Sequence, residues 1–264
     1  YSGSSAMRTI DLNCDMGESF GAYTLGMDEE VIRRVTSANI ACGFHASDPV
    51  VMANTAKLCK IHGVMAGAHP GYPDLLGFGR RSMGLSEREI LDYTIYQVGA
   101  LKGLLDFYDL PLQHVKLHGA LYNYLVNEED LAIAVASAVR KAFGDIIFVT
   151  LGTEQTARLK DRCRTEGIRV ALEAFPDRSY TDGGRLLSRN DKGAVLADHV
   201  LIAQRAVRMV KEGGVESVNG KFIRMDIDTL CIHGDSVAAV AAAGLLREYA
   251  AREGIEIRPL CAIV

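Results

Sequence analysis

The chain has 264 residues, of which 48% are hydrophobic and 23% are charged, and its formal net charge is −4. Its Lys and Arg residues are scattered along the sequence, which argues against a nucleic-acid-binding protein and favours a small-molecule partner. No apolar run approaches the roughly 18 residues that a membrane span needs, so we expect a cytoplasmic protein without membrane-spanning segments.

Short apolar runs that end in Gly, His, Asn or Asp recur along the chain, and each leads to a helical pattern. Residues 1–6 (YSGSSA) precede Met7 and resemble an expression-tag remnant, so they are not counted in the predicted domain. The seven predicted strands lie at residues 8–15, 37–45, 64–71, 114–121, 145–152, 169–177 and 228–235. The predicted helices lie at residues 28–36, 48–62, 86–108, 127–142, 153–166, 193–212 and 236–253. Ser86 stands three residues before Glu89, which predicts a capping box, and residues 218–230 predict a small hairpin before the last strand.

Seven strand–helix units without a dividing linker fit either an open doubly wound sheet or a closed barrel. Polar clusters follow nearly every predicted strand, and in a barrel all of the loops after the strands face one mouth. We therefore predict that residues 7–264 form one catalytic α/β domain, a seven-stranded, TIM-like β/α barrel. Six cysteines without a CxxC pair are predicted to be buried, reduced thiols.

Acidic and amide side chains alternate in the first predicted strand. Asp11, Asn13 and Asp15 therefore share one face of it, and Glu18 follows shortly after. Burial of so many polar groups is costly unless they have partners, which indicates a functional cluster. The alternative is a loop-forming cluster without a chemical role.

Four of the seven histidines, His45, His69, His118 and His233, stand near the ends of predicted strands, and Asp235 follows the last of them. One such histidine alone would more often be a hydrogen-bonded core group. Four histidines at the same end of the predicted strands instead favour proton transfer or metal ligation. The candidate metal ligands are Asp15, His45 and His69, although the HExxH signature is absent. The other histidines, His62, His114 and His199, are assigned structural or surface roles.

Cationic side chains near the strand ends suit a bound carboxylate or phosphate. The candidates for contacts with substrate or phosphate are Asn13, Arg80, Lys116, Glu173, Arg178, Tyr180, Arg189 and His233. Arg80 and Arg189 could instead be solvated loop charges. The chain lacks a P-loop, a dinucleotide fingerprint and a GxSxG elbow, so any ATP site would be nonstandard.

The chain contains, in order, the motifs DLNCDMGESFG, NIACGFHASDP, GAHPGYPDLLGFGRR, KLHGALYN, EAFPDRSY and CIHGD. Together they resemble the LamB/YcsF family, which comprises the A-type subunits of 5-oxoprolinase, from about Ile10 to the C-terminus. The resemblance implies a barrel of the glycoside hydrolase/deacetylase type. Two departures are visible: Leu117 stands where the family usually has Pro, and Ser236-Val237 where it commonly has Thr-Pro.

The resemblance also implies ATP-dependent opening of 5-oxo-L-proline to L-glutamate, with two partner subunits of the B and C type. ATP would be the cosubstrate and Mg2+ its expected companion, and self-association into a homo-oligomer stays open. Residue chemistry then suggests the roles. Arg80, Lys116 and Arg189 would hold phosphate or the substrate carboxylate. Asp15, Glu18 and Asp235 would serve as base or Mg2+ ligands, and His45, His69, His118 and His233 would transfer protons or bind metal.

Two other functions fit parts of the pattern. The first is a metal-dependent amidase or deacetylase that acts without ATP. One observation argues against it: the carboxylates and histidines are spread over five strands rather than gathered in one compact ligand motif. The second is a regulator or scaffold that binds a small carboxylate without catalysis, for which so polar a pocket would be costly.

Overall fold

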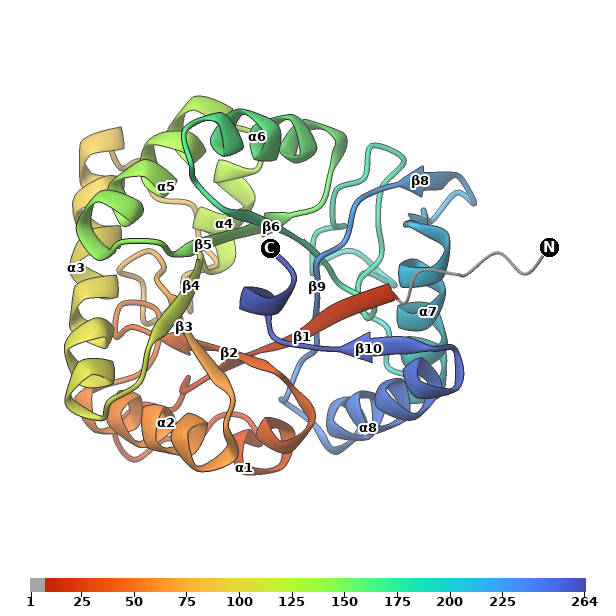
Figure 1. The fold of residues 1–264 in the computed structure, drawn as a ribbon, viewed down its shortest axis with the longest axis horizontal. Helices are drawn as coiled ribbons and strands as arrows, with labels where there is room; N and C mark the ends of the chain where they lie inside the picture. The colour runs from red at the N-terminus through yellow and green to blue at the C-terminus, as the bar shows by residue number, and fades with distance from the viewer. Residues whose placement is uncertain (1–7) are drawn as a thin grey trace.

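Seven parallel strands form a closed ring in the computed structural model, which describes residues 8–264 (Figure 1). Neighbouring strands pair in chain order, and the last strand of the ring closes it against the first. The strands are β1 (Arg8–Met16), β2 (Ser37–Ala41), β3 (Met65–His69), β4 (Leu112–Lys116), β5 (Ile147–Leu151), β6 (Val170–Ala174) and β9 (Thr229–Cys231). The predicted seven-stranded β/α barrel is confirmed, whereas the interpretation of residues 1–6 as a tag lies outside the described residues.

The strands are buried on both faces. Every residue of β2, β4, β5 and β6 is buried, because inward side chains fill the ring and outward side chains pack against helices. The first strand, β1, is the longest, and its first three residues pair with β10 (Ile255–Ile257) outside the ring. Strand β10 was not predicted, since three residues after a glycine give too short a pattern.

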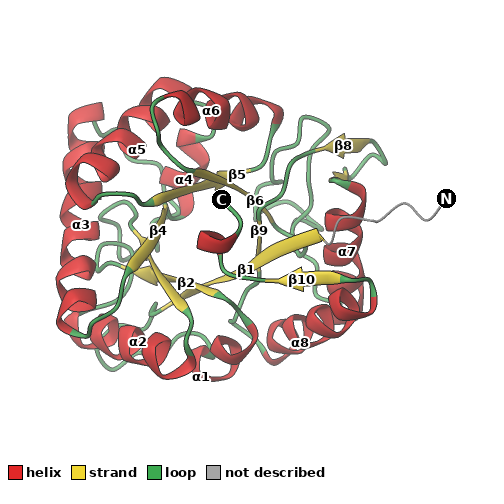
Figure 2. Cartoon of the chain, in the orientation of Figure 1, coloured by secondary structure: helices red, strands yellow, loops and turns green. Residues whose placement is uncertain are grey.

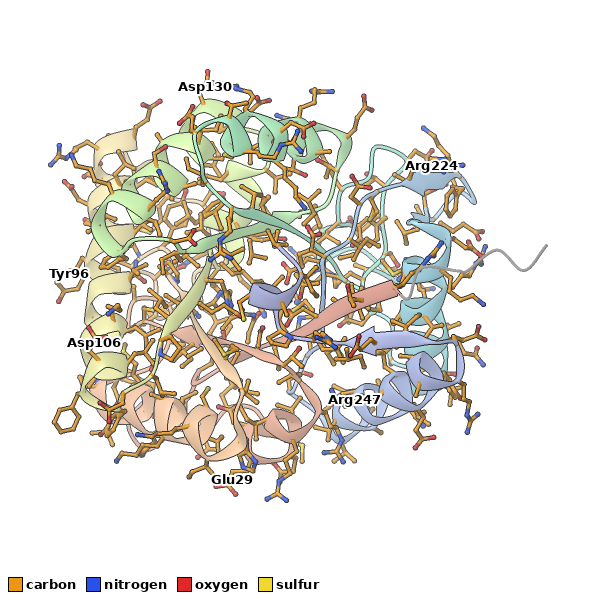
Figure 3. The ribbon with its side chains drawn as sticks, in the orientation of Figure 1. Glu29, Tyr96, Asp106, Asp130, Arg224 and Arg247 are labelled. Carbon is orange, nitrogen blue, oxygen red and sulfur yellow. The ribbon has the colours of Figure 1, made fainter. Side chains whose placement is uncertain are left out.

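The helices surround the ring of strands (Figure 2). They are α1 (Asp28–Val31), α2 (Pro49–His62), α3 (Glu87–Phe107), α4 (Gly119–Leu125), α5 (Glu129–Phe143), α6 (Glu154–Thr165), α7 (His199–Glu212) and α8 (Val237–Arg252), with 3-10 turns η1 (Ile32–Arg34) and η2 (Leu260–Ala262). Side chains such as Glu29, Asp106 and Asp130 project outward from this layer (Figure 3). No helix within residues 8–264 is both long and apolar enough to cross a membrane.

The helix ends follow the capping residues. Ser86 and Glu89 form the predicted capping box at the start of α3. At α7 the prediction was wrong by six residues, because the side chain of Asp198 accepts hydrogen bonds from the amides of Val200 and Leu201 and starts the helix there.

Three further predictions need correction. The pattern at residues 28–36 forms a four-residue helix followed by a 3-10 turn, not one helix. The short helix α4 was not predicted, because it begins directly after the fourth strand. The hairpin predicted in residues 218–230 is confirmed in part: β8 (Phe222–Arg224) lies there, but its antiparallel partner β7 (Gly214–Glu216) precedes that segment.

The C-terminal segment fills the amino end of the barrel. Leu260 is fully buried and packs against Ile147, Val149 and Ala171. The amide of Cys261 donates to the Oε1 atom of Gln113 over 3.1 Å. Figure 1 shows the C-terminus near the centre of the ring. This end of the barrel is therefore packed with side chains, and the polar strand ends meet at the opposite end.

Candidate active site

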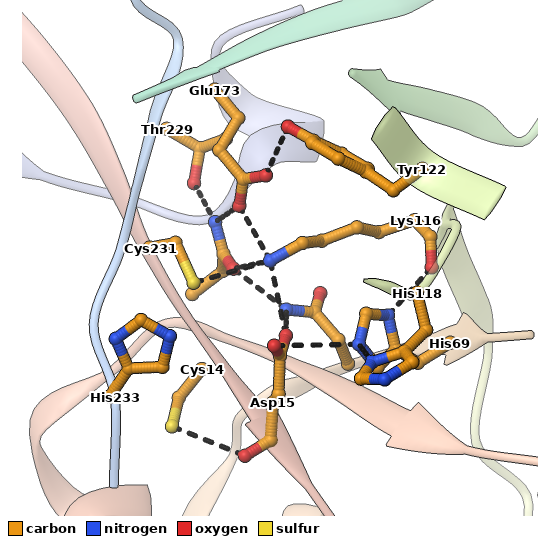
Figure 4. Close-up of polar contacts among 12 residues, drawn as sticks. Cys14, Asp15, His69, Lys116, His118, Tyr122, Glu173, Thr229, Cys231 and His233 are labelled. Atoms are coloured by element: carbon orange, nitrogen blue, oxygen red, sulfur yellow. Dashed lines mark hydrogen bonds and ion pairs between the residues drawn. The ribbon is translucent and has the colours of Figure 1, made fainter. Parts of the chain in front are cut away.

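A cavity of about 650 Å3 lies at the carboxyl ends of the strands. Many of the predicted site residues line it: Asp15, Glu18, His69, Arg80, Lys116, His118, Arg178, Arg189, His233 and Asp235. They lie at or after the ends of different strands, so closure of the ring brings them together. Figure 4 shows Asp15, His69, Lys116, His118 and His233 among them. The prediction placed these residues at one mouth, and the structure does so.

Four predicted site residues do not line this cavity. Asn13 and Glu173 are buried below its floor, and His45 lies behind the ring of His118. Tyr180 is fully buried, and its hydroxyl accepts a hydrogen bond from the amide of Phe175 over 2.9 Å. Tyr180 therefore shapes the loop after β6, since its hydroxyl is directed to the backbone.

Lys116 is the centre of an ion-pair network beneath the cavity. Its Nζ atom lies 2.7 Å from Glu173 Oε1 and 3.1 Å from Asp15 Oδ1. The hydroxyl of Tyr122 donates to the other oxygen of Glu173 over 2.7 Å. Burial lowers the pKa of Lys116, but the surrounding negative charges, Asp15 foremost, outweigh it and hold the pKa well above its ordinary value. The Lys116 ammonium is already paired with two carboxylates, so it holds Asp15 and Glu173 in place.

Asp15 is the carboxylate that this network presents to the cavity. Its Oδ1 atom accepts hydrogen bonds from Lys116 and from Asn39 Nδ2, over 3.1 and 2.8 Å. Its Oδ2 atom lies 3.4 Å from His69 Nε2. Burial raises the pKa of Asp15, but the neighbouring His69 and Lys116 outweigh it and hold the pKa well below its ordinary range. Asp15 is therefore ionised at neutral pH.

Amide and imidazole side chains fill the barrel below Asp15. Asn39 donates to Asn13 Oδ1 over 2.7 Å, and its own Oδ1 atom lies 2.6 Å from His114 Nε2. His114 is fully buried, so of the structural and surface roles that were expected only the structural one remains. Thr229 and Ser37 donate to Asp11 in a deeper layer. These layers explain why polar residues alternate along β1: their partners come from neighbouring strands.

Three imidazole rings cluster on one side of the cavity. His45 stacks on His118 with ring centres 3.6 Å apart, and its Nε2 atom lies 3.1 Å from Glu18 Oε1. His69 Nε2 lies 3.0 Å from His118 Nδ1. Burial and neighbouring histidines hold the pKa of His118 well below its ordinary value, and the same causes act on His45. Burial and the charge of Asp15 raise the pKa of Glu18.

A second acid–base group stands across the cavity. His233 Nδ1 is hydrogen-bonded to Asp177 Oδ2, and Arg189 Nη2 can donate to His233 Nε2 over 3.2 Å while that nitrogen is unprotonated. Burial lowers the pKa of His233, but the charge of Asp177 outweighs it and raises the pKa above its ordinary value. An imidazolium that is oriented by a carboxylate can donate a proton.

Guanidinium groups lie around the cavity. Arg80 and Arg189 are exposed at its edge, and Asp235 is exposed at the same rim. Arg178 is buried, and it donates to the carbonyl oxygens of Leu187 and Ala194, so it also holds the loop that carries Arg189. The cavity therefore combines cations for an anionic group with carboxylates and imidazoles for proton transfer.

Three contributors to the site were not predicted from the sequence. Tyr122 lies on α4, which was itself missed, and Asn39 lies inside a strand whose pairing was unknown. Asp177 stands in the quoted motif EAFPDRSY, so its carboxyl group near a strand end was a usable signal. Tertiary contacts alone reveal what each of them holds in place.

The cysteines agree with the prediction except for one. Cys14, Cys42 and Cys231 lie near the polar clusters, and all three are buried free thiols. Burial raises the pKa of Cys42 to about 12, and it raises the pKa values of Cys14 and Cys231. Such thiols are poor nucleophiles at neutral pH. Cys261 is exposed, which corrects the prediction that it is buried.

A family model described as the LamB/YcsF family matches residues 10–264. The chain belongs to the LamB/YcsF family. Relatives in this family include two proteins that are named as the A-type subunit of 5-oxoprolinase. The one from Pyrococcus horikoshii is 49% identical over 251 residues, and the one from Campylobacter jejuni subsp. doylei is 47% identical over 251 residues. Each alignment covers 95% of this chain and 97% of the relative.

A solved structure shows the same fold at high identity. It is described as a lactam utilization protein from Thermus thermophilus, with 43% sequence identity and a TM-score of 0.85. The match covers 95% of this chain and 99% of that chain. The resemblance to the LamB/YcsF family that the motifs indicated is thereby confirmed along nearly the whole chain.

Proposed function

We propose that this LamB/YcsF chain takes part in the ATP-dependent hydrolysis of 5-oxo-L-proline to L-glutamate, ADP and phosphate. It would act as one component of a complex with two partner subunits of the B and C type. The observation that carries the proposal is the cavity in which carboxylates, imidazoles and guanidinium groups converge. The names of the relatives, which refer to 5-oxoprolinase and to lactam utilization, support the choice of substrate.

The chemistry of the lactam explains why ATP is needed. A five-membered lactam is a resonance-stabilised amide with a poor leaving group, so direct hydrolysis is slow at neutral pH. Transfer of the γ-phosphoryl group to the lactam oxygen makes the ring carbon electrophilic. Water adds to that carbon, and the ring C–N bond breaks as the nitrogen takes a proton, which gives γ-glutamyl phosphate. A second water then releases phosphate, so one ATP and two waters yield ADP, phosphate and glutamate.

The residues of the cavity match these demands. Arg80 and Arg189 would hold the substrate carboxylate or the transferred phosphoryl group. Asp15, whose Oδ1 atom is fixed by Lys116, would accept a proton from water at Oδ2. His233, oriented by Asp177, would protonate the ring nitrogen.

Mg2+ is proposed to accompany ATP. Asp235 is exposed at the rim of the cavity and offers an oxygen ligand of the kind that Mg2+ prefers. Bound to ATP, Mg2+ would neutralise phosphate charge. A cytoplasmic location and self-association stay predictions from the sequence.

The proposal is tested by reconstitution. Production of ADP and glutamate from 5-oxoproline is measured with this chain alone and with both partner subunits. Equal amounts of ADP and glutamate, formed only by the full set, are expected. Asp15→Ala and His118→Ala should abolish turnover and keep the fold. Asp161→Ala and His199→Ala, at exposed positions on α6 and α7, are the matched controls and should retain turnover.

A metal-dependent amidase that acts without ATP is the second candidate, and the histidine cluster beside Glu18 favours it. The same assay separates the two functions. Lactam opening by this chain alone, without ATP and sensitive to a chelator, would replace the first proposal by the second. Coupled ATP consumption would exclude the second.

A further inference from the structure

The rings of His69 and His118 are oriented by the backbone. His69 Nδ1 lies 2.7 Å from the carbonyl oxygen of Lys116, and His118 Nε2 lies 2.8 Å from that of Phe78. A carbonyl oxygen only accepts hydrogen bonds, so these two nitrogens carry the protons. In neutral rings the lone pairs then sit on His69 Nε2 and His118 Nδ1, which face one another at 3.0 Å. Two lone pairs at this distance repel unless a proton or a metal ion lies between them.

A carboxylate completes the cluster. Glu18 Oε1 lies 3.8 Å from His118 Nδ1. The ligand atoms that Glu18, His45, His69 and His118 can offer all lie within 4.8 Å of one another. Two ligand atoms bound tetrahedrally to Zn2+ at about 2.0–2.1 Å are about 3.3 Å apart. The distance between the two histidine nitrogens, 3.0 Å, is slightly shorter than this, and the distance from Glu18 Oε1 to His118 Nδ1, 3.8 Å, is slightly longer. We propose that Glu18, His69 and His118 bind one divalent transition-metal ion.

The groups behind these three residues support a metal site. Histidine ligands of metals generally donate their second N–H to a carbonyl or carboxylate, as His69 and His118 do. His45 contacts Glu18 Oε1 over 3.1 Å and stacks on His118, so it positions both ligands. The backbone of Gly79 adopts a φ of +63°, and a Cβ atom there would lie 2.7 Å from His45 Cβ and 2.9 Å from His118 Cδ2. Glycine thus lets the loop after β3 pack closely against both histidine side chains.

The ligand types select the class of ion. Two imidazoles with one carboxylate suit Zn2+, Co2+ and related ions, whereas Mg2+ prefers oxygen ligands in an octahedron. All three proposed ligands line the cavity, which leaves a coordination position accessible to small molecules. The ion is therefore distinct from the Mg2+ that would travel with ATP. The sequence pattern suggested Asp15, His45 and His69. The geometry points instead to Glu18 and His118 beside His69, with Asp15 Oδ2 next to them.

The test measures metal binding by this chain alone, so its outcome does not depend on ATP, 5-oxoproline or partner subunits. The purified chain is stripped with a chelator and titrated with Co2+, whose visible absorption reports on ligands, and then with Zn2+. We expect one ion per chain, displacement of Co2+ by Zn2+, and no competition from millimolar Mg2+. Glu18→Gln, His69→Gln and His118→Gln should each weaken binding by about 100-fold or more. His45→Gln, at a positioning residue, should weaken it by about 10–100-fold.

His199→Gln, at the exposed start of α7, is the control and should bind as the wild type does. Circular dichroism and thermal unfolding check that each variant is folded. X-ray absorption of the Zn2+-loaded wild-type chain gives a measurement that needs no variant, and it should show two imidazole ligands. The proposal is overturned if the wild type binds no more Zn2+ or Co2+ than His118→Gln does. A zinc spectrum without imidazole scattering would overturn it as well.

Discussion

Lys116 Nζ lies 2.7 Å from Glu173 Oε1 at a depth where both side chains are almost fully buried. The same ammonium is 3.1 Å from Asp15 Oδ1, so one cation faces two carboxylates. Charges buried in this way are stable only as a group, because each of them would otherwise lack solvation. The position of Asp15 on β1 therefore depends on the cation of Lys116 from β4 and on the carboxylate of Glu173 from β6. Two other strands of the ring lie between β1 and β4.

Removal of the cation should be costly. Lys116→Met leaves Asp15 and Glu173 without their partner, and we expect the free energy of unfolding at pH 7 to fall by about 3–5 kcal/mol. Urea denaturation followed by circular dichroism measures this change. Lys141→Met, at an exposed position on α5, is the control and should change stability by less than about 0.5 kcal/mol. A loss below about 1 kcal/mol in Lys116→Met would show that the network does not stabilise the fold.

The pair of Asp177 and His233 predicts a shift of the pH–rate profile. Asp177 raises the pKa of His233, and a proton donor loses activity as the pH rises through its pKa. Asp177→Asn should therefore move the alkaline limb of kcat/KM to lower pH, while turnover at acidic pH is less affected. The reconstituted complex is assayed across the pH range. An unchanged alkaline limb would remove His233 from the role of proton donor.

Asp11 predicts a pH dependence of stability. Burial raises the pKa of Asp11 from its ordinary value of 3.8 to about 6 in the folded chain. The folded state thus holds this proton more tightly than the unfolded state, so stability falls as the pH rises from about 4 to about 6. The loss is about 3 kcal/mol at 1.36 kcal/mol per pKa unit.

The exchange Asp11→Asn removes this titration. The difference in unfolding free energy between Asp11→Asn and the wild type should therefore change as the pH rises from about 4 to about 6. Asp161→Asn, at an exposed position, should differ from the wild type by less than about 0.5 kcal/mol. A constant difference between Asp11→Asn and the wild type from pH 4 to pH 7 would contradict the raised pKa.

Two glycines give opposite predictions for the same exchange. A Cβ atom at Gly67 on β3 would collide with the ring of His114, which the barrel holds in place, so Gly67→Ala should lower stability by about 3 kcal/mol. Gly103 lies exposed within α3 with no neighbouring atom near its Cβ position, and Gly103→Ala should raise stability by about 0.5–1 kcal/mol. Thermal unfolding of both variants checks the signs. A tolerated Gly67→Ala would mean that the His114 ring can move.

The sequence by itself determined the seven strands of the ring, most helices and the end of the barrel that carries the chemistry. Its signals are local: apolar runs of strand length, capping residues such as Ser86 and Asp48, and polar residues directly after the strands. Parallel strands in a ring direct their carboxyl ends to the same side, so the motif residues had to converge. Strand β10 was missed because its pattern is short. The start of α7 was misplaced because a loop separates the predicted start from the real cap, Asp198.

Only the tertiary structure decided which groups meet. Lys116 read as a free cation in the sequence, but the register of the ring places it against Asp15 and Glu173. Tyr180 read as a site residue, but the path of its loop buries the hydroxyl against Phe175. Pairing between segments far apart in the chain depends on strand register, ring closure and loop path, because these set distances that no local pattern encodes.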